Sequence, residues 1–211
     1  MRNFIHGTIP ALRRTALLAT VAAVGGLSLS MGTAPMMDRS QFEIMKGEDV
    51  VGRIVASRNA QGPRTTYLMT SHSEFTMLWK QVVRTTTVAE YSDGLLHTCH
   101  ANLWINGSMR DSSHMQLAKS PENCYVHPDR RFVQASKVEW TTARMYFDEP
   151  LGITAVFVES VLEHCRLLPL GNHRYRLYLP DSKVNDYTYR NGVLEEIAVD
   201  RKLVDLVFRR V

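Results

Sequence analysis

The sequence predicts a mainly β protein, an antiparallel meander that forms a curved sheet, a half-barrel or a barrel, with one short helix. Successive segments rich in Val, Thr, Tyr and Phe, the residue types that favour strands, are separated by short turn motifs. Asn106-Gly107 and Asn191-Gly192 are the strongest of these motifs, because both central residues of a two-residue hairpin turn need a positive φ. We expect about ten strands joined by short connections.

The first six strands follow from β-favouring composition and turn residues. They are expected at residues 42–46, 50–57, 65–78, 80–91, 95–105 and 108–118. The segment 95–105 alternates most clearly, with Leu, His, Cys, Ala, Leu and Ile at its odd positions. A period of two places these side chains on one face, which we expect to face the core.

The second half mixes shorter strands with the one helix candidate. Extended pieces are expected at 123–127, 132–138 and 141–146, and Asp148-Glu149-Pro150 ends the last of them. Residues 153–165 are the best helix candidate, although their apolar residues form no clean stripe, so we expect one or two turns. Alternating strands then return around 174–179, 187–189, 193–199 and 204–209.

The first 30 residues differ from the rest of the chain. A basic start with Arg2, Arg13 and Arg14 precedes an uncharged, mostly apolar run, and small residues follow it. This order predicts a secretory signal peptide over 1–30, cleaved near 30–34, ahead of a single antiparallel β domain over 41–211. We therefore expect export, to the periplasm. The alternative is an uncleaved membrane anchor, for which the apolar run of about 15 residues is shorter than the usual span of about 20.

The charge balance argues against nucleic-acid binding. The chain holds 25 Lys and Arg against 21 Asp and Glu, and three of the basic residues lie in 1–30, which leaves 22 against 21. The longest basic clusters are only pairs, such as Arg130-Arg131 and Arg209-Arg210. A nucleic-acid surface needs a clustered excess of Lys and Arg, which this sequence lacks.

Three sets of motifs resemble an uncharacterised family of exported bacterial proteins, a domain of unknown function. They are Phe42-x-Ile44-x-Lys46 before Val51-Gly52, Tyr146-Phe147-Asp148-Glu149-Pro150 before Val156-Phe157-x-Glu159, and Tyr175-x-Leu177-x-Leu179-Pro180-Asp181 before Asn185-x-Tyr187-x-Tyr189-x-Asn191-Gly192. The chain departs from the family where Val158, Val161 and Leu162 stand in place of an expected Ser and Gly, so the resemblance supports no role for a hydroxyl there. The resemblance covers most of 41–211 and implies export and a β-rich fold. It brings no established activity and so no catalytic residue.

Metal binding has weak candidates in His97, Cys99 and His127. Zinc takes about four nitrogen or sulfur ligands in a tetrahedron, whereas on a strand His97 and Cys99 share one face and His100 points away. No zinc-finger spacing is present, so we predict no metal and no cofactor. The three cysteines, Cys99, Cys124 and Cys165, fit either one disulfide and one thiol, or three buried thiols.

No catalytic residue is predicted. The sequence has no Gly-x-Ser-x-Gly motif. A carboxylate group of Asp148, Glu149, Glu159 and Glu163 would suit general acid catalysis if one member were buried with a raised pKa. The structural alternative is that Asp-Glu before Pro ends a strand and that Glu159 bonds to backbone amides in a loop.

The candidate ligand-binding residues are Tyr175, Tyr187, Tyr189 and Glu159. Aromatic side chains at alternate spacing either pack within a sheet or line an apolar cavity. Together with export and the missing catalytic motifs, they favour a non-enzymatic binding or carrier protein that holds a hydrophobic or lipid-like ligand on a curved sheet. The alternatives are a structural or interaction module with a protein partner in the cell envelope, a metal-binding protein, or a hydrolase.

Overall fold

The computed structural model describes residues 36–76, 79–117, 125–127, 137–200 and 205–211. The chain separates into two units, Met1–Gly32 and Thr33–Val211, and all described residues belong to the second. The predicted signal peptide lies outside the described residues, as do Cys124 and most of the strand expected at 132–138. In the described part of the chain, no helix has the length and apolar character needed to cross a membrane.

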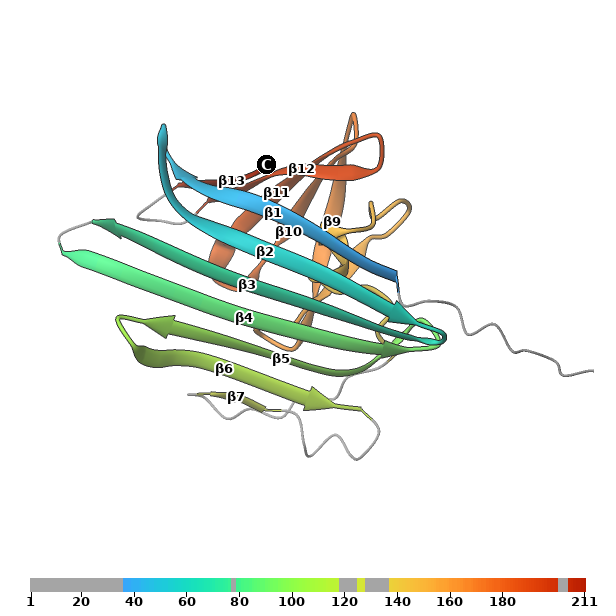
Figure 1. The fold of residues 1–211 in the computed structure, drawn as a ribbon. Coiled ribbons are helices and arrows are strands. Elements are labelled where there is room, and N and C mark those ends of the chain that lie inside the picture. The colour runs from blue at the N-terminus through green and yellow to red at the C-terminus, as the bar shows by residue number, and fades with distance from the viewer. Residues whose placement is uncertain (1–35, 77–78, 118–124, 128–136, 201–204) are drawn as a thin grey trace, which may run out of the picture. The chain divides into compact units, whose positions relative to one another are not determined.

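Thirteen strands of the described segments form one antiparallel sheet (Figure 1). Their bounds are β1 Met36–Lys46, β2 Asp49–Gln61, β3 Arg64–Thr76, β4 Lys80–Ser92, β5 Leu95–Ile105, β6 Ser108–Gln116, β7 Tyr125–His127, β8 Ala155–Val158, β9 Glu163–Gly171, β10 Arg174–Tyr178, β11 Val184–Arg190, β12 Val193–Asp200 and β13 Leu206–Arg210. The sheet order is β7-β6-β5-β4-β3-β2-β1-β13-β12-β11-β10-β9-β8. Two meanders therefore join where β1 pairs with β13, which confirms the predicted antiparallel, curved fold.

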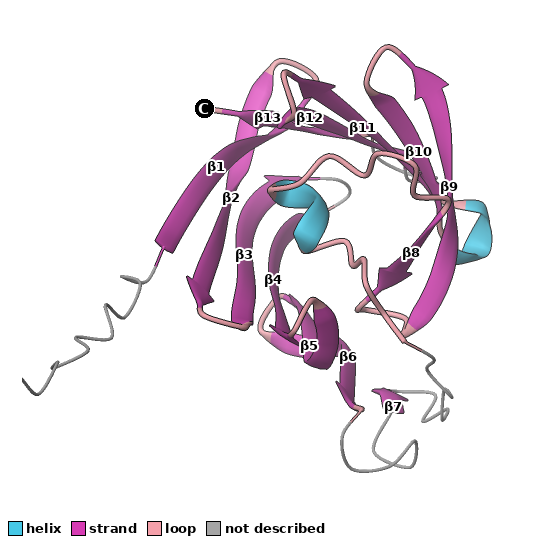
Figure 2. Ribbon diagram, turned by 90° about the vertical axis from the view of Figure 1, so that its right-hand side faces the viewer, coloured by secondary structure: helices cyan, strands magenta, loops and turns pink. Residues whose placement is uncertain are grey.

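The sheet curls around an interior but is not closed by strand pairing (Figure 2). Its edges are β7 and β8, and the backbone of 138–142 links the edge strand β8 to the beginning of β5. Phe157 N–H donates to the Trp140 carbonyl at 2.9 Å, and Leu96 N–H donates to the Val138 carbonyl at 2.8 Å. The seam of the sheet, the opening beside the free edge of β8, is thus covered by this loop, which satisfies backbone groups that a bare edge would expose.

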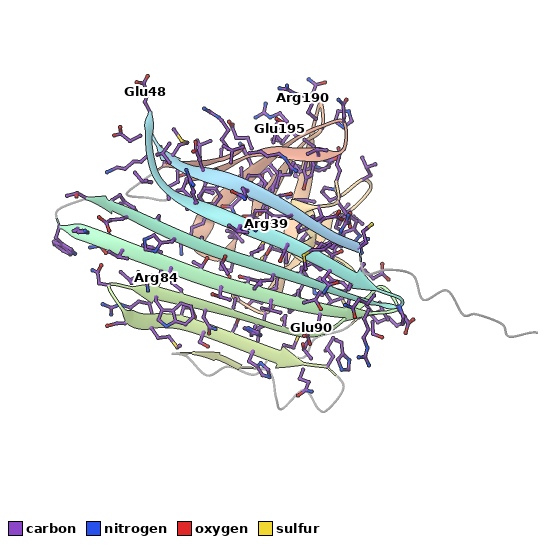
Figure 3. All side chains as sticks on the ribbon, viewed as in Figure 1. Arg39, Glu48, Arg84, Glu90, Arg190 and Glu195 are labelled. Carbon is purple, nitrogen blue, oxygen red and sulfur yellow. The ribbon has the colours of Figure 1, made fainter. Side chains whose placement is uncertain are left out.

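Both strong hairpin motifs form the turns that were predicted. Asn106 and Gly107 have φ values of 51° and 81°, and Asn191 and Gly192 have values of 53° and 78°. The turns connect β5 to β6 and β11 to β12. The side chains of the strands alternate between the two faces of the sheet, and Arg39, Arg84 and Glu90 point away from the sheet on its outer face (Figure 3).

The prediction of a helix at 153–165 is wrong, because this segment forms β8, a turn and the beginning of β9. Val156 and Val158 pack into one core cluster, while Phe157, between them, packs into the other. A strand that is buried on both faces shows no polar alternation, so periodicity alone does not separate it from a buried helix. The described residues contain two single turns of 3₁₀ helix instead, η2 at Arg144–Tyr146 and η3 at Pro180–Ser182.

Two further expectations about strands are wrong. The strand expected at 141–146 gives way to η2, with only an isolated bridge from Thr141 to Phe157. In β5, a bulge shifts the register between Glu90 and Tyr91 of the neighbouring strand. Leu96 is therefore buried and His97 is exposed, although the alternation predicted that position 97 would face the core.

Candidate functional site

The concave side of the sheet encloses a cavity of about 490 Å³. It starts beside η2, at Thr142 and Tyr146, and extends toward the end of the sheet that carries the β1–β2 and β3–β4 turns. At that end, Lys46 Nζ donates to the Thr76 carbonyl at 2.8 Å and joins the end of β1 to the end of β3. The volume lies within the range of about 300–1,000 Å³ that is usual for small-molecule sites.

The lining of this cavity is amphipathic. One part is apolar and comes from β1, β12, β13 and the end of β10, with Ile44, Val199, Leu206, Phe208 and Leu179. Another part comes from the inner face of β3 and β4 and carries the hydroxyls of Ser71, Ser73, Thr85 and Thr87. The Ser71 and Thr85 hydroxyls hydrogen-bond to each other across these two strands at 2.6 Å.

Charged and amide groups also reach the lining. Asp111 of β6, Lys183 beside η3 and Asn185 of β11 line the cavity, and each already has an interaction partner. A ligand in the cavity would therefore meet an apolar surface, a row of hydroxyls and a few groups that can fix its orientation.

Of the three predicted tyrosines, Tyr187 lines the cavity, and the other two brace the segment around η2. Tyr189 donates its hydroxyl to the Met145 carbonyl at 2.6 Å, and Tyr175 donates to Glu149 at 2.7 Å. The Tyr175 and Tyr189 rings meet edge to face at 5.7 Å between centroids. Burial, and then the Glu149 carboxylate, raise the pKa of Tyr175 to about 12, so this hydroxyl remains a hydrogen-bond donor.

Glu159 is buried, with 1% of its surface exposed, and does not line the cavity. Its carboxylate accepts hydrogen bonds from the Thr142 hydroxyl and from Ala143 N–H, the latter at 2.9 Å. Burial raises the pKa of Glu159, while the two hydrogen bonds act in the opposite direction. This geometry agrees with the structural alternative, because Glu159 anchors the loop that covers the seam.

The other carboxylates of the predicted group have different partners. Asp148 accepts from Arg58 at 2.8 Å and from Arg144 at 3.0 Å, and Arg58 also bonds Asp38 at 2.6 Å. Burial lowers the pKa of Arg58, but the Asp38 hydrogen bond and the nearby negative charges outweigh it and raise that pKa overall. These ion pairs lie between β1, β2 and the η2 segment and hold the segment in place.

Glu149 belongs to a second small network. It contacts His173 at 2.9 Å and accepts the Tyr175 hydrogen bond. Glu159 lies apart from it, against Thr142 and Ala143. The carboxylates of the predicted group thus serve separate contacts.

The two metal candidates whose side chains are described, His97 and Cys99, do not share an environment. The bulge in β5 leaves His97 exposed and Cys99 fully buried, and the side chain of His127 lies outside the described residues. No group of three or more His, Cys, Asp or Glu in the described segments is placed to hold an ion. Cys165 carries a buried thiol whose pKa is raised to about 11, first by burial and then by the charge of Glu163.

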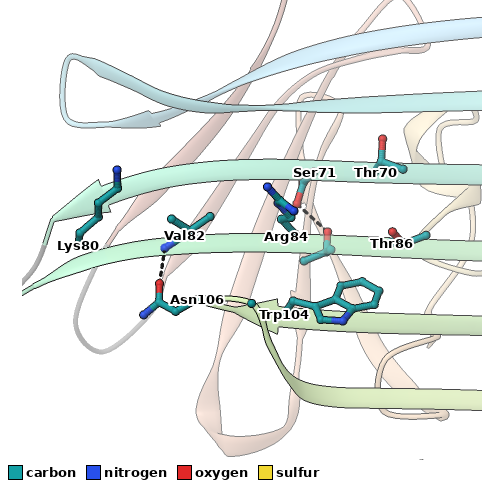
Figure 4. A pocket seen from close by; sticks show the side chains of 10 residues that line it. Thr70, Ser71, Lys80, Val82, Arg84, Thr86, Trp104 and Asn106 are labelled. Carbon is teal, nitrogen blue, oxygen red and sulfur yellow. Dashed lines mark hydrogen bonds between the residues drawn. The ribbon is translucent and has the colours of Figure 1, made fainter.

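A second hollow, of about 800 Å³, lies on the outer face of β3, β4 and β5 (Figure 4). Its lining includes Thr70, Lys80, Val82, Arg84, Thr86, Trp104 and Asn106. Sequence reasoning missed this site. The one available signal was a tryptophan at position 104, on the otherwise polar face of β5.

Comparisons with known proteins describe the fold and name no activity. Residues 42–211 match the family model described as "Domain of unknown function (DUF6134)". A crystal structure of a beta-barrel-like protein of domain of unknown function DUF1849 from Brucella abortus is similar with a TM-score of 0.50 and 11% identity, over 84% of this chain and 95% of that chain. At this identity the likeness shows the fold alone. No match was found among curated proteins.

Proposed function

The chain belongs to the DUF6134 family, a domain of unknown function, and we propose that it is an exported, non-enzymatic binding protein that holds a hydrophobic or lipid-like small molecule inside its curved sheet. The observation that carries this proposal is the cavity of about 490 Å³ on the concave side. Protein interiors are close-packed and hold few voids larger than a water molecule. A space of this size, formed by strands from both meanders, favours a binding role over a purely structural one.

The amphipathic lining supports a ligand with an apolar body and a polar edge. The side chains of Ile44, Leu206 and Phe208 offer apolar contact, which contributes about 25 cal/mol per Å² of apolar surface removed from water. The hydroxyls of Ser73 and Thr87 can pair with the polar edge, which would be costly to bury without partners.

The contacts of the conspicuous ionisable residues support a role without catalysis. Glu159 and Tyr189 use their polar atoms to hold the loop around η2 rather than to face the cavity. Of the predicted ligand-binding residues, Tyr187 lines the cavity, which supports it as a contact for a bound molecule.

The test is a titration of the full chain with a dansyl-labelled medium-chain fatty acid, whose fluorescence rises and shifts to the blue in an apolar site. Val83 lines the cavity, so Val83→Trp fills part of it. Val82 precedes it on β4 and lines the outer hollow instead, so Val82→Trp is a matched control for size and strand position. We expect Val83→Trp to weaken binding by about tenfold or more and Val82→Trp to change it by less than about twofold.

Equal weakening by both variants would contradict a site inside the sheet, as would the absence of binding at about 1 mM probe. The melting temperature of each variant shows whether a lost signal reflects lost folding. Native mass spectrometry of protein purified from its own envelope would add the mass of any retained molecule.

A further inference from the structure

We propose that the outer face of β3, β4 and β5 carries a second binding site, for an acidic saccharide, with Arg84 to bind the carboxylate and Trp104 to contact the sugar ring. This site is independent of the proposed cavity ligand, because it lies on the other side of the same strands. Nothing in the family description assigns it.

The strand register brings the two anchor residues together. Arg84 is the Cα partner of Trp104 on β5 and of His72 on β3, so the three side chains form one row across the outer face. Directly paired residues have Cβ atoms about 4.5–5.5 Å apart. Thr70 and Thr86 form the next row in the same way. One cation, one indole and two hydroxyls therefore share a single patch (Figure 4).

Arg84 is suited to bind a carboxylate. Its side chain is exposed, and its Nε donates to His72 Nδ1 at 3.2 Å. Within the described segments Arg84 forms no ion pair, whereas Lys80 at the end of the hollow already pairs with Glu74 at 2.5 Å. The guanidinium thus has N–H groups available for the two-pronged hydrogen bonds that carboxylates accept.

Trp104 offers a flat surface beside this cation. It is partly buried, and in the described part of the chain its indole stacks on no other ring and lies under no cation. The apolar face of a sugar ring can cover it, and the hydroxyls of Thr70 and Thr86 with the amide of Asn106 can pair with sugar hydroxyls.

The length of the hollow favours a saccharide over a smaller anion. It extends along β4 from Lys80 to Thr86, a distance of six residue steps, or about 20 Å at about 3.4 Å per step. An inorganic phosphate would leave Trp104 unused, and a single aromatic acid would leave most of the hydroxyls without a partner. Several linked sugar rings would use the whole patch.

The experiment is isothermal titration calorimetry of the full chain with trigalacturonate as the probe. Neutral maltotriose, benzoate and inorganic phosphate are the comparison ligands. We expect trigalacturonate to bind, and Arg84→Gln and Trp104→Ala each to weaken it by about tenfold or more. The controls are Arg53→Gln and Trp79→Ala, at exposed side chains of the same types that lie outside the hollow. The controls should change binding by less than about twofold.

Three results would overturn the proposal: no trigalacturonate binding at about 5 mM, equal binding of a comparison ligand, or equal losses in the control variants. The variant Val83→Trp should leave trigalacturonate binding unchanged, while Val82→Trp should reduce it. These two variants separate a failure of the outer site from a failure of the cavity proposal.

Discussion

The buried carboxylate of Glu159 is expected to control how firmly the seam of the sheet is covered. It accepts hydrogen bonds from Thr142 and from Ala143, both in the loop that bonds to the edge strand β8. Two substitutions separate its contributions. Glu159→Ala removes both acceptors, and Glu159→Gln keeps the size of the side chain and one acceptor oxygen but never ionises.

The expected cost of Glu159→Ala follows from these contacts. Ala143 is fully buried, so its N–H would lose its acceptor without gaining water, at a cost of about 1–3 kcal/mol. The void that remains adds about 1–2 kcal/mol. We therefore expect Glu159→Ala to lower the free energy of unfolding by about 2–5 kcal/mol, whereas Glu159→Gln should stay within about 1 kcal/mol near neutral pH.

The pH dependence has a definite sign. Because burial raises the pKa of Glu159 above 4.5 in the folded state, the folded protein holds this proton more tightly than the unfolded chain does. The resulting stability is fully present below about pH 4.5 and is lost as the pH rises through the folded-state pKa. Glutamine does not titrate, so the wild type should lose stability relative to Glu159→Gln as the pH rises.

Urea unfolding followed by far-ultraviolet circular dichroism, at about pH 5 and about pH 8, measures both effects. The reasoning is refuted if Glu159→Ala lies within about 0.5 kcal/mol of the wild type. It is also refuted if the wild type gains stability relative to Glu159→Gln between the two pH values.

Two further predictions concern packing and thiol reactivity. Gly52→Ala should lower the free energy of unfolding by about 1–3 kcal/mol, because the new Cβ would lie 2.6 Å from the Ser73 Cα. In thermal melts the control Ser57→Ala should stay within about 0.5 kcal/mol of the wild type, and equal melting of both variants would contradict the close approach of β2 and β3. Cys165, whose thiol is buried and has a pKa near 11, should resist iodoacetamide at about pH 8 in the native protein and react fully in urea. Rapid labelling of the native protein, measured by peptide mass spectrometry, would contradict the burial of this thiol.

The hairpins were predictable because their signals are local. Asn106-Gly107 specifies a turn through its own backbone preferences, whatever the rest of the chain does. The η2 turn was not predictable, because the group that fixes it, Glu159, lies 16 residues beyond the Ala143 amide that it accepts from. The bulge that turns His97 outward depends on pairing with β4, and sequence alternation carries no information about that register.

The candidate site was likewise predictable only where the signal is local. Alternation correctly places Tyr187 and Tyr189 on one face, but depth within the curved sheet decides which of them lines the cavity, and alternation does not encode depth. The outer hollow depends on three strands being in register, so that Arg84 meets Trp104 and His72. Contacts across strands follow from the assembled sheet and not from the spacing within any one strand.

The pairing of β1 with β13 has a consequence for how the chain reaches its native state. Phe42 lies opposite Arg210, so the junction between the two meanders joins residues from opposite ends of the domain. Bringing such distant partners together carries a large loop-closure entropy and gives the topology a high contact order. Each meander can assemble from neighbouring segments, but β13, which comes last among the strands of this sheet in chain order, unites them, so the sheet cannot be completed before β13 is present.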